Sequence, residues 1–171
     1  DAPVILLNGF SKAYLMTGWR CGYICMNSRS KKLAGLRQDI PKLARVRIAS
    51  NLPVQIAAVQ ALRGPQSHIP RMVGKLRERR DYVVKRLNGM GIHCKVPRGA
   101  FYVFPEINLA SRWHDDQHFV VDLLNNTGVL TVHGSGFGPT YGSAHFRIVY
   151  LPPEEMLEKA MDRLERFVHS K

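Results

Sequence analysis

The beginning of the chain places a polar loop between two short apolar runs. Residues Val4–Leu7 and Gly22–Met26 are apolar stretches of strand length, and the loop between them contains Lys12. Short apolar runs of this kind are typical of strands. The pattern therefore predicts two strands that bracket the loop, and the first of them is predicted to be buried.

Two helices are predicted before residue 65. Ser28 is expected to cap a helix that runs to about Gln38, and Pro41 is expected to interrupt it, because proline lacks the backbone N–H that a helix uses. The next helix is predicted over 53–64 from "PVQIAAVQALRG", where proline suits the first turn and glycine the end. Strands and helices therefore alternate in the first third of the chain.

A long amphipathic helix is predicted after the segment "GPQS". Apolar residues recur at helical spacing until Gly89 or Gly91, and glycine favours the end of a helix. The Gly, Pro and Ser residues within 64–70 mark the predicted boundary between two domains, 1–66 and 67–171. The apolar positions of the helix are Met72, Val73, Leu76, Val83, Val84 and Leu87.

The remaining residues again alternate strands and helices. Strands are predicted in "AFYVFPEI" (100–107), "VLTVHG" (129–134) and "HFRIVY" (145–150), and helices over 115–126 and 153–168. The predicted fold class is α/β, without internal repeats. The inner stripe of the last helix comprises Met156, Leu157, Ala160, Met161, Leu164, Phe167 and Val168.

Composition and charge narrow the class of function only in part. Of the 171 residues 45% are apolar, and no run reaches the roughly 18 apolar residues that a membrane span needs, so we expect a soluble, cytoplasmic protein. The net charge of +12 is scattered over helix-like segments such as "KLRERRDYVVKRL", without a nucleic-acid-binding motif. Three cysteines without a CxxC pair and seven histidines without HExxH spacing predict neither a disulfide framework nor a metal site.

Lys12 and Arg20 are two cations in one loop between apolar strands. A lysine in a loop is most often a surface residue, and that interpretation holds for Lys12 taken alone. If its side chain points inward, burial lowers the pKa of its ammonium group, which suits an amine that attacks a carbonyl. Arg20 stays charged and needs a permanent anion, for which phosphate is a geometric match. Pyridoxal phosphate offers both an aldehyde and a phosphate, so it would satisfy both cations.

Arg147 is a third cation, in the middle of the predicted strand 145–150. Strand alternation places Phe146, Ile148 and Tyr150 on one face and Arg147 on the other. One interpretation is a structural arginine that pairs with a carboxylate elsewhere in the fold. The other, favoured beside a pyridoxal site, is a bidentate contact with a substrate carboxylate.

These motifs resemble those of the class I/II, fold type I aminotransferases, which use pyridoxal 5'-phosphate. The stretch "NGFSKAYLMTGWRCGY" (8–23) is similar to the lysine segment of that family. The stretches "SNLPVQ", "PRGAFYVFPEI", "VHGSGFG" and "FRIVYLPPEE" follow in the family's order, so the resemblance covers essentially the whole chain. Within the family, "HDDQHFVVDLL" and "RIVYLP" are most similar to the alanine aminotransferase group.

The resemblance implies a role for each matching residue. Lys12 would bind the cofactor aldehyde and then move a proton at the substrate α-carbon as a general acid and base. Arg20 would hold the cofactor phosphate, with the hydroxyl of Ser11 as a helper. Arg147 would bind the substrate α-carboxylate.

Two further segments are weaker candidates for the site. The turn "GSGFG" (134–138) could be mistaken for a dinucleotide loop, but the sequence runs through Pro139 to another strand instead of a helix. By resemblance this turn would approach the substrate, although His133 stands where the family commonly has proline. The aromatic residues of "RGAFYVFP" are interpreted as core residues at strand alternation, with Tyr102 a minor site candidate.

The resemblance also implies that the chain is the C-terminal part of a longer enzyme. Upstream of the lysine the family carries an aspartate for the pyridine nitrogen, a tyrosine, an asparagine and a ring-stacking aromatic residue, and only eleven residues precede Lys12 here. Residues 1–66 would be a remnant of the cofactor-binding large domain, and 67–171 the small domain. We expect the isolated chain to be inactive, and to self-associate through apolar surface exposed before Gly64.

For the intact protein the resemblance implies transfer of an amino group between an amino acid and a 2-oxo acid. Alanine and glutamate are the expected amino acids, and the intact enzyme would be a homodimer with neither nucleic acid nor membrane as a partner. Two alternatives stay open. One is an aspartate or broad-specificity aminotransferase, and the other is a non-catalytic binding module that reuses the small domain.

Overall fold

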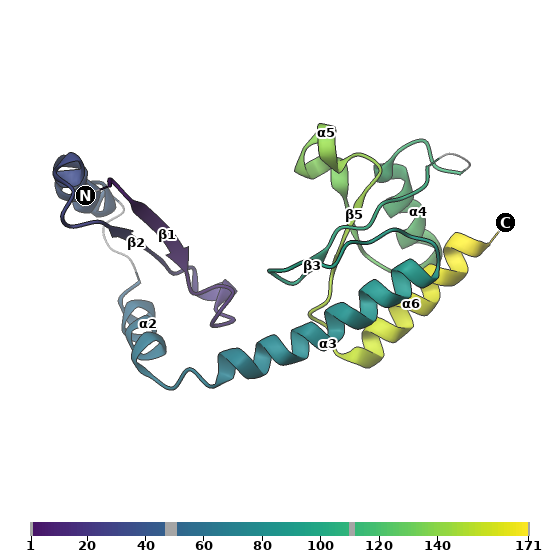
Figure 1. Ribbon diagram of the computed structural model, residues 1–171, viewed down its shortest axis with the longest axis horizontal. Helices are drawn as coiled ribbons and strands as arrows, with labels where there is room; N and C mark the ends of the chain where they lie inside the picture. Colours follow the sequence, from purple (N-terminus) through teal and green to yellow (C-terminus); the bar gives the residue numbers. More distant parts are fainter. Residues whose placement is uncertain (1, 47–50, 110–111, 171) are drawn as a thin grey trace. The chain divides into compact units, whose positions relative to one another are not determined.

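The protein, described here by a computed structural model, divides into two compact units, Asp1–Arg71 and Met72–Lys171. Both units contain helices and strands (Figure 1), and the boundary falls inside the long helix α3 (His68–Gly89). The predicted α/β class is confirmed. The assignment of 1–66 and 67–171 to parts of two aminotransferase domains stays a prediction. The structure describes residues 2–46, 51–109 and 112–170.

The first unit opens with an antiparallel pair of strands. β1 (Ile5–Gly9) and β2 (Gly22–Met26) pair over their full length, and Gly9 lies opposite Gly22 where the pair ends at the loop. A Cβ on Gly22 would lie 3.0 Å from the carbonyl oxygen of Asn8, so the close approach of the two strands favours glycine there. Both predicted strands are confirmed, although β1 is shifted towards the loop.

Two α-helices follow in the first unit, α1 (Ala34–Arg45) and α2 (Leu52–Arg63). The second agrees with the helix predicted over 53–64. The helix predicted from Ser28 to Gln38 is wrong in its bounds, because α1 begins only after a 3-10 turn, η2 (Lys31–Leu33).

The side chain of Asn27 accounts for the late start of α1. The Oδ1 of Asn27 accepts a hydrogen bond from the N–H of Arg29 at 3.0 Å, and the backbone carbonyl of Asn27 accepts one from the N–H of Ser30 at 3.3 Å. A turn closed in this way competes with the helix. The predicted interruption at Pro41 is also wrong, since Pro41 lies inside α1. The missing N–H removes one helical bond, and on an exposed helix water can serve the carbonyl four residues earlier.

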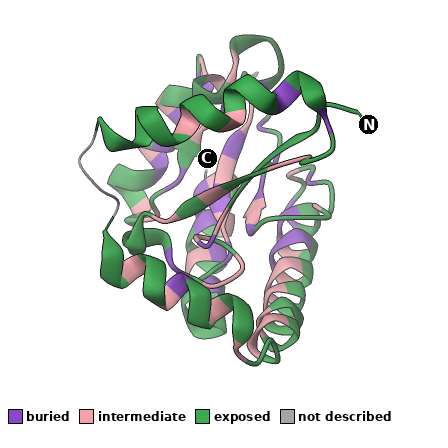
Figure 2. Cartoon of the chain, turned by 90° about the vertical axis from the view of Figure 1, so that its left-hand side faces the viewer, coloured by how far each residue is buried: buried purple, intermediate pink, exposed green. Residues whose placement is uncertain are grey.

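The first unit buries few of its apolar residues. Its small core consists of Phe10, Met16 and Ala58, whereas Leu7 on β1 is 72% exposed. Figure 2 colours the chain by burial, and exposed residues cover much of it. The prediction of a buried first strand is therefore wrong for the described residues, because an apolar run predicts a strand but not the layer that covers it. The expected exposure of apolar surface before Gly64 is confirmed. The exposed large apolar residues are Val4, Ile5, Leu6, Leu7, Leu15, Trp19, Ile24, Leu36, Leu43, Val46, Leu52, Ile56, Val59 and Leu62.

The second unit is built around a three-stranded antiparallel sheet in the order β3–β5–β4. The strands are β3 (Tyr102–Val103), β4 (Val132–His133) and β5 (Phe146–Val149). In the central strand Arg147 lies opposite Val132 on β4. The strands predicted in this unit are confirmed in position but are shorter than predicted.

Three helices accompany this sheet, and all three were expected from helical periodicity. They are α3, α4 (Asp116–Thr127) and α6 (Glu154–His169). Asp115 caps α4, because its Oδ1 accepts a 2.6 Å hydrogen bond from the N–H three residues later. Gly128 ends the helix in the left-handed conformation, with φ of 70°.

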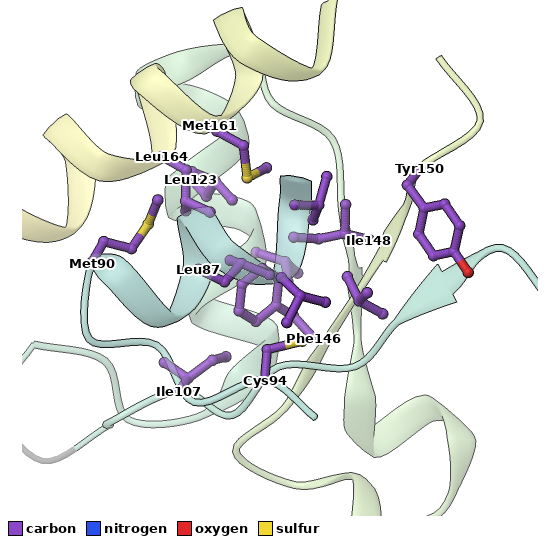
Figure 3. Packing of buried hydrophobic residues seen from close by; sticks show 14 of the residues in the cluster. Leu87, Met90, Cys94, Ile107, Leu123, Phe146, Ile148, Tyr150, Met161 and Leu164 are labelled. Atoms are coloured by element: carbon purple, nitrogen blue, oxygen red, sulfur yellow. The ribbon is translucent and has the colours of Figure 1, made fainter. Parts of the chain in front are cut away.

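The helices and the sheet of the second unit enclose the main core (Figure 3). Two predicted inner positions are wrong, since Val73 on α3 and Met156 on α6 are exposed. Helical periodicity marks the apolar face of a helix but not how far along the helix that face is covered. The most deeply buried residues include Leu87, Leu123, Phe146, Met161 and Leu164.

Candidate functional site

The loop between β1 and β2 carries both Lys12 and Arg20. The N–H of Phe10 donates to the carbonyl of Cys21 at 3.2 Å, directly beyond the last strand pair, and this bond closes the loop. Lys12 follows Phe10 by two residues, and Arg20 precedes Cys21 by one. Two cations that are eight residues apart in the sequence therefore start from the same closed base.

Buried and hydrogen-bonded residues fix the inside of this loop. The carbonyl of Phe10 accepts hydrogen bonds from the N–H groups of Tyr14 at 3.2 Å and of Met16 at 3.4 Å. The rings of Phe10 and Tyr14 have their centroids 5.3 Å apart, and the Tyr14 hydroxyl donates to Oε1 of Gln66 at 3.0 Å. The loop is thus held at its middle as well as at its base.

Arg20 has an unusual backbone. Its φ of 52° and ψ of 45° are left-handed, which costs a non-glycine residue about 1–2 kcal/mol. Leu15 in the same loop has φ of 53°. The Nη1 of Arg20 donates to the carbonyl of Thr17 at 3.1 Å. The shape of the loop, and not a local preference, therefore sets where the Arg20 guanidinium lies.

Lys12 is not buried in this structure. The described residues leave Lys12 and Arg20 exposed and Ser11 half-buried. The condition of an inward-pointing Lys12 is therefore not met among the described residues, which agree with the surface interpretation. The strands beside the loop also expose apolar side chains. The functional roles of the three residues stay predictions.

Arg147 belongs to the second unit, on the outer face of β5. The predicted alternation is confirmed: Phe146, Ile148 and Tyr150 are buried in the core, and Arg147 is half-buried on the opposite face. Its Cζ lies 4.7 Å from the ring centroid of Tyr102 and 4.5 Å from that of Phe137. Two aromatic rings therefore contact one guanidinium.

The hydrogen bonding of Arg147 is incomplete. Its Nε is buried without a hydrogen-bond partner, and within 2–46, 51–109 and 112–170 no carboxylate forms an ion pair with it. The interpretation of Arg147 as half of a structural ion pair therefore finds no support among the described residues. A buried arginine donor without a partner favours an anionic ligand.

A groove of about 480 Å³ opens beside Arg147. Its mostly apolar wall includes Leu130, Val132, Val149 and Met156. The groove also includes Leu157 and Met161 of the core, whereas Tyr102 and Phe137, the rings that contact the Arg147 guanidinium, do not line it.

Phe137, which contacts Arg147, and Asp116, which bonds the same turn, were not found from the sequence. Phe137 lies in the turn 134–138, which the sequence marked only by its glycines. Asp116 accepts a 2.6 Å hydrogen bond from the N–H of Ser135 in that same turn. The sequence signal for Asp116 was its position after Asp115, because one acid suffices to cap the helix and the second is then available to another partner.

Other kinds of site find little support. The part of the chain that the structure describes contains no group of three or more His, Cys, Asp or Glu side chains that could hold a metal ion. Burial raises the pKa of the Cys94 thiol to about 11, so this cysteine is a packing residue and not a nucleophile. No described helix has the combined length and apolarity that crossing a bilayer requires.

Comparisons with known proteins identify the family. The family model "Aminotransferase class I and II" matches residues 1–164. Glutamate-pyruvate aminotransferase AlaA of Haemophilus influenzae is 38% identical over 172 residues, which cover 98% of this chain and 42% of that protein. A probable aspartate/prephenate aminotransferase of Rhizobium leguminosarum is 41% identical over 95% of this chain and 41% of its own length.

Solved structures agree with this result. Alanine aminotransferase from Pyrococcus furiosus matches with a TM-score of 0.93 and 50% identity, over 100% of this chain and 43% of that one. Aspartate aminotransferase from Thermotoga maritima matches with a TM-score of 0.81 and 35% identity, over 97% and 40%. The chain thus spans about two-fifths of the length of the proteins it matches. Because the family model covers nearly every residue, the chain belongs to the aminotransferase class I and II family.

Proposed function

We propose that this chain forms part of a pyridoxal-phosphate-dependent aminotransferase that transfers an amino group between an amino acid and a 2-oxo acid. Alanine and glutamate are the proposed amino acids, supported by similarity to a glutamate-pyruvate aminotransferase and an alanine aminotransferase. Residues 1–66 and 67–171 are assigned to the large and small domains of the intact protein, which we propose is a homodimer.

The observation that carries this proposal is the shared loop of Lys12 and Arg20. The hydrogen bond between Phe10 and Cys21 closes that loop, which carries a primary amine, a guanidinium and the hydroxyl of Ser11. These three groups fit pyridoxal phosphate, because an amine bonds an aldehyde carbon, and a guanidinium with a hydroxyl binds a phosphate. Lys12 would hold the aldehyde end of the cofactor, and Arg20 with Ser11 the phosphate end.

Proton transfer and substrate binding are assigned to Lys12 and Arg147. The cofactor, when bound, stabilises negative charge at the substrate α-carbon. Lys12 carries a proton to and from that carbon as a general acid and base. Arg147 binds the α-carboxylate with its planar fork.

A second candidate substrate is favoured by a separate observation. Similarity to a probable aspartate/prephenate aminotransferase and to an aspartate aminotransferase supports aspartate as the amino donor. The two candidates are distinguished by comparing kcat/KM of the full-length protein for alanine and for aspartate, with 2-oxoglutarate as the acceptor. A higher value for aspartate would overturn the alanine proposal but keep the aminotransferase.

The central test uses the full-length protein that contains this chain, purified with pyridoxal phosphate. We expect a visible absorption band of the bound cofactor and turnover of an amino acid with a 2-oxo acid. Lys12→Ala is expected to lose the band and to lower turnover about a thousandfold or more. Lys32→Ala, at an exposed lysine of η2, is the matched control and should keep both. A full-length protein without the band, or an unchanged band in Lys12→Ala, would favour the non-catalytic module.

The cofactor anchor and the isolated chain are tested separately. Arg20→Gln is expected to weaken the binding of pyridoxal phosphate by roughly 10- to 100-fold, because a charge-assisted contact with phosphate is lost. Arg29→Gln, at an exposed arginine, serves as its control. The 171-residue chain by itself is expected to show no turnover, and measurable transamination by it would contradict that part of the proposal.

A further inference from the structure

We propose that Asp116 is a positioning residue for Arg147, on which it acts through the loop that carries Phe137. Asp116 holds the backbone of Ser135, the loop 134–142 then keeps Phe137 against the guanidinium, and the guanidinium is oriented before a carboxylate arrives. The inference rests on the proposed function, since that function gives Arg147 the task of binding the substrate α-carboxylate.

Asp116 is the anchor of this arrangement. Its side chain is buried, at 3% exposure, and its Oδ2 accepts a 2.6 Å hydrogen bond from the N–H of Ser135. A buried carboxylate is stable only with partners of this kind. Burial raises the pKa of Asp116. The hydrogen bonds from Ser135, together with the electrostatic effect of nearby His133, lower it by more, so the pKa lies below its ordinary value. The anchor is therefore ionised at neutral pH.

The loop between the anchor and Arg147 has little conformational freedom. It comprises the 3-10 helix η3 (Gly134–Phe137) and the short helix α5 (Pro139–Gly142). A Cβ on the glycine that begins η3, or on the glycine that ends α5, would collide with the carbonyl oxygen of the other. The first of these glycines also donates to the carbonyl of His145 at 2.8 Å. A shift at the anchored end is therefore passed on to Phe137.

Phe137 is held by contacts although its side chain is open to solvent. It is 54% exposed, and its ring centroid lies 4.5 Å from Cζ of Arg147. The ring of Phe104 meets it edge-on, with centroids 6.0 Å apart, and Phe104 in turn stacks on His145 at 5.1 Å. An exposed phenylalanine with these neighbours is suited to orient a guanidinium, and it fills no core.

The contacts of Arg147 leave its donors available. The guanidinium lies over the rings of Tyr102 and Phe137, and these contacts occupy none of its N–H donors. Its Nε has no hydrogen-bond partner among the described residues. A guanidinium that is already ordered loses less side-chain entropy when it binds a carboxylate. The arrangement is therefore preorganised for a planar anion.

The first test needs no cofactor and uses the 171-residue chain. The Nε–Hε signal of Arg147 is assigned by its loss in Arg147→Lys, and its heteronuclear NOE is measured by NMR. We expect a rigid signal in the parent chain and in the control Tyr141→Leu, an exposed aromatic residue of α5. In Asp116→Ala and Phe137→Leu the signal should become mobile. A signal that is equally rigid in Asp116→Ala, or mobile in the parent chain, overturns the proposal.

The second test measures steady-state kinetics of the full-length enzyme. Asp116→Ala is expected to raise KM for the amino acid roughly tenfold with kcat within about twofold, because uniform binding is lost. Asp116→Asn keeps an acceptor for the N–H of Ser135 and should recover most of the affinity. Phe137→Leu should raise KM roughly fivefold, and Tyr141→Leu should leave it unchanged.

The outcomes separate this inference from the proposed function. A full-length protein without transaminase activity overturns the proposed function, while the NMR measurement still decides whether Asp116 orders Arg147. If Asp116→Ala lowers thermal stability but leaves both KM and the Arg147 signal unchanged, the residue has a structural role only, and the positioning proposal is wrong. If kcat falls and KM stays constant, the proposal is wrong as well.

Discussion

The two units differ in how they cover their apolar residues. Among the described residues, 19 buried residues form a single cluster in the second unit, whereas three form the cluster of the first. Lys12 and Arg20 lie in the poorly covered unit, and Arg147 lies in the well-covered one. Arg147 therefore lies on a sheet that packs on a large core, whereas the lysine loop is ordered by hydrogen bonds and a small local core.

This difference has an energetic meaning. Burial of apolar surface stabilises a fold by about 25 cal/mol per Å², and each exposed apolar side chain lacks this stabilisation. Residues along β1, α1 and α2 forgo it together, and exposed apolar surface of this extent is typical of an interface. The second unit gains that burial internally. Substitutions of the same type should therefore have different effects in the two units.

The largest difference is expected for leucine truncation. Leu123→Ala removes a fully buried side chain and should lower the free energy of unfolding of the second unit by about 2–5 kcal/mol. Leu7→Ala, on exposed β1, should change that of the first unit by about 0.5 kcal/mol or less. Urea unfolding is followed by the fluorescence of Trp113 in a Trp19→Phe background for the second unit, and by hydrogen exchange of β2 for the first.

The same experiment can break the comparison. If Leu7→Ala proves as destabilising as Leu123→Ala, β1 is covered in solution, for example by the self-association expected from its apolar surface. Light scattering on the same samples distinguishes the two cases. A monomer with a strongly destabilising Leu7→Ala would contradict the contrast between the units.

The positions of the helices could be predicted from the sequence better than the burial of their residues. Periodicity located α3, α4 and α6, and proline and glycine located α2, because these signals are local. Helical periodicity does not predict that Val73 is exposed while Val83 is buried, because burial depends on which part of the helix the rest of the unit covers. The late start of α1 followed from hydrogen bonds of Asn27, a turn signal that competes with the cap expected at Ser28.

The candidate site was predictable to a similar extent. The positions of Lys12 and Arg20 in one loop, and of Arg147 on the outer face of a strand, followed from patterns that span a few residues. The contact between Phe137 and Arg147 joins segments with no shared pattern, so sequence reasoning missed it. The sequence left open whether Lys12 is exposed or buried, because burial needs a layer that no local signal describes.

Glycine substitution should give the next largest difference. Gly142→Ala in the second unit places a Cβ against the backbone carbonyl of Gly134, so we expect a loss of about 3 kcal/mol in thermal or urea unfolding. Gly35→Ala lies inside exposed α1 with no atom within 4 Å of the new Cβ. It should stabilise the first unit by roughly 0.5–1 kcal/mol, because alanine favours a helix. A neutral Gly142→Ala would show that the loop between Gly134 and Gly142 is not tightly packed.

A smaller difference is expected from pH. The folded pKa of Asp116 lies below its unfolded value, so its contribution to stability is present above the unfolded pKa of about 3.9 and is lost as the pH falls through the folded pKa. Unfolding of the second unit below pH 4 should therefore become easier, and Asp116→Asn should flatten that dependence and cost about 2 kcal/mol at pH 7. Asp39→Asn, at an exposed residue of α1, is the control. An Asp116→Asn variant with an unchanged acid transition would contradict the ionised anchor.

The smallest expected effect compares two ion pairs. In the second unit, Nη2 of Arg86 donates to Asp162 at 2.7 Å and to Glu165 at 3.0 Å, which ties α3 to α6. In the first unit, Lys42 pairs with Asp39 at 2.8 Å within one exposed helix. A pair that joins two packed helices restrains more of the chain than a pair within one turn, so Arg86→Met should cost about 1 kcal/mol and Lys42→Met about 0.3 kcal/mol or less. Half a molar salt should reduce the first cost and leave the second near zero, because screening weakens partly exposed pairs. Equal costs in urea unfolding would mean that the contact between α3 and α6 is maintained by apolar packing alone.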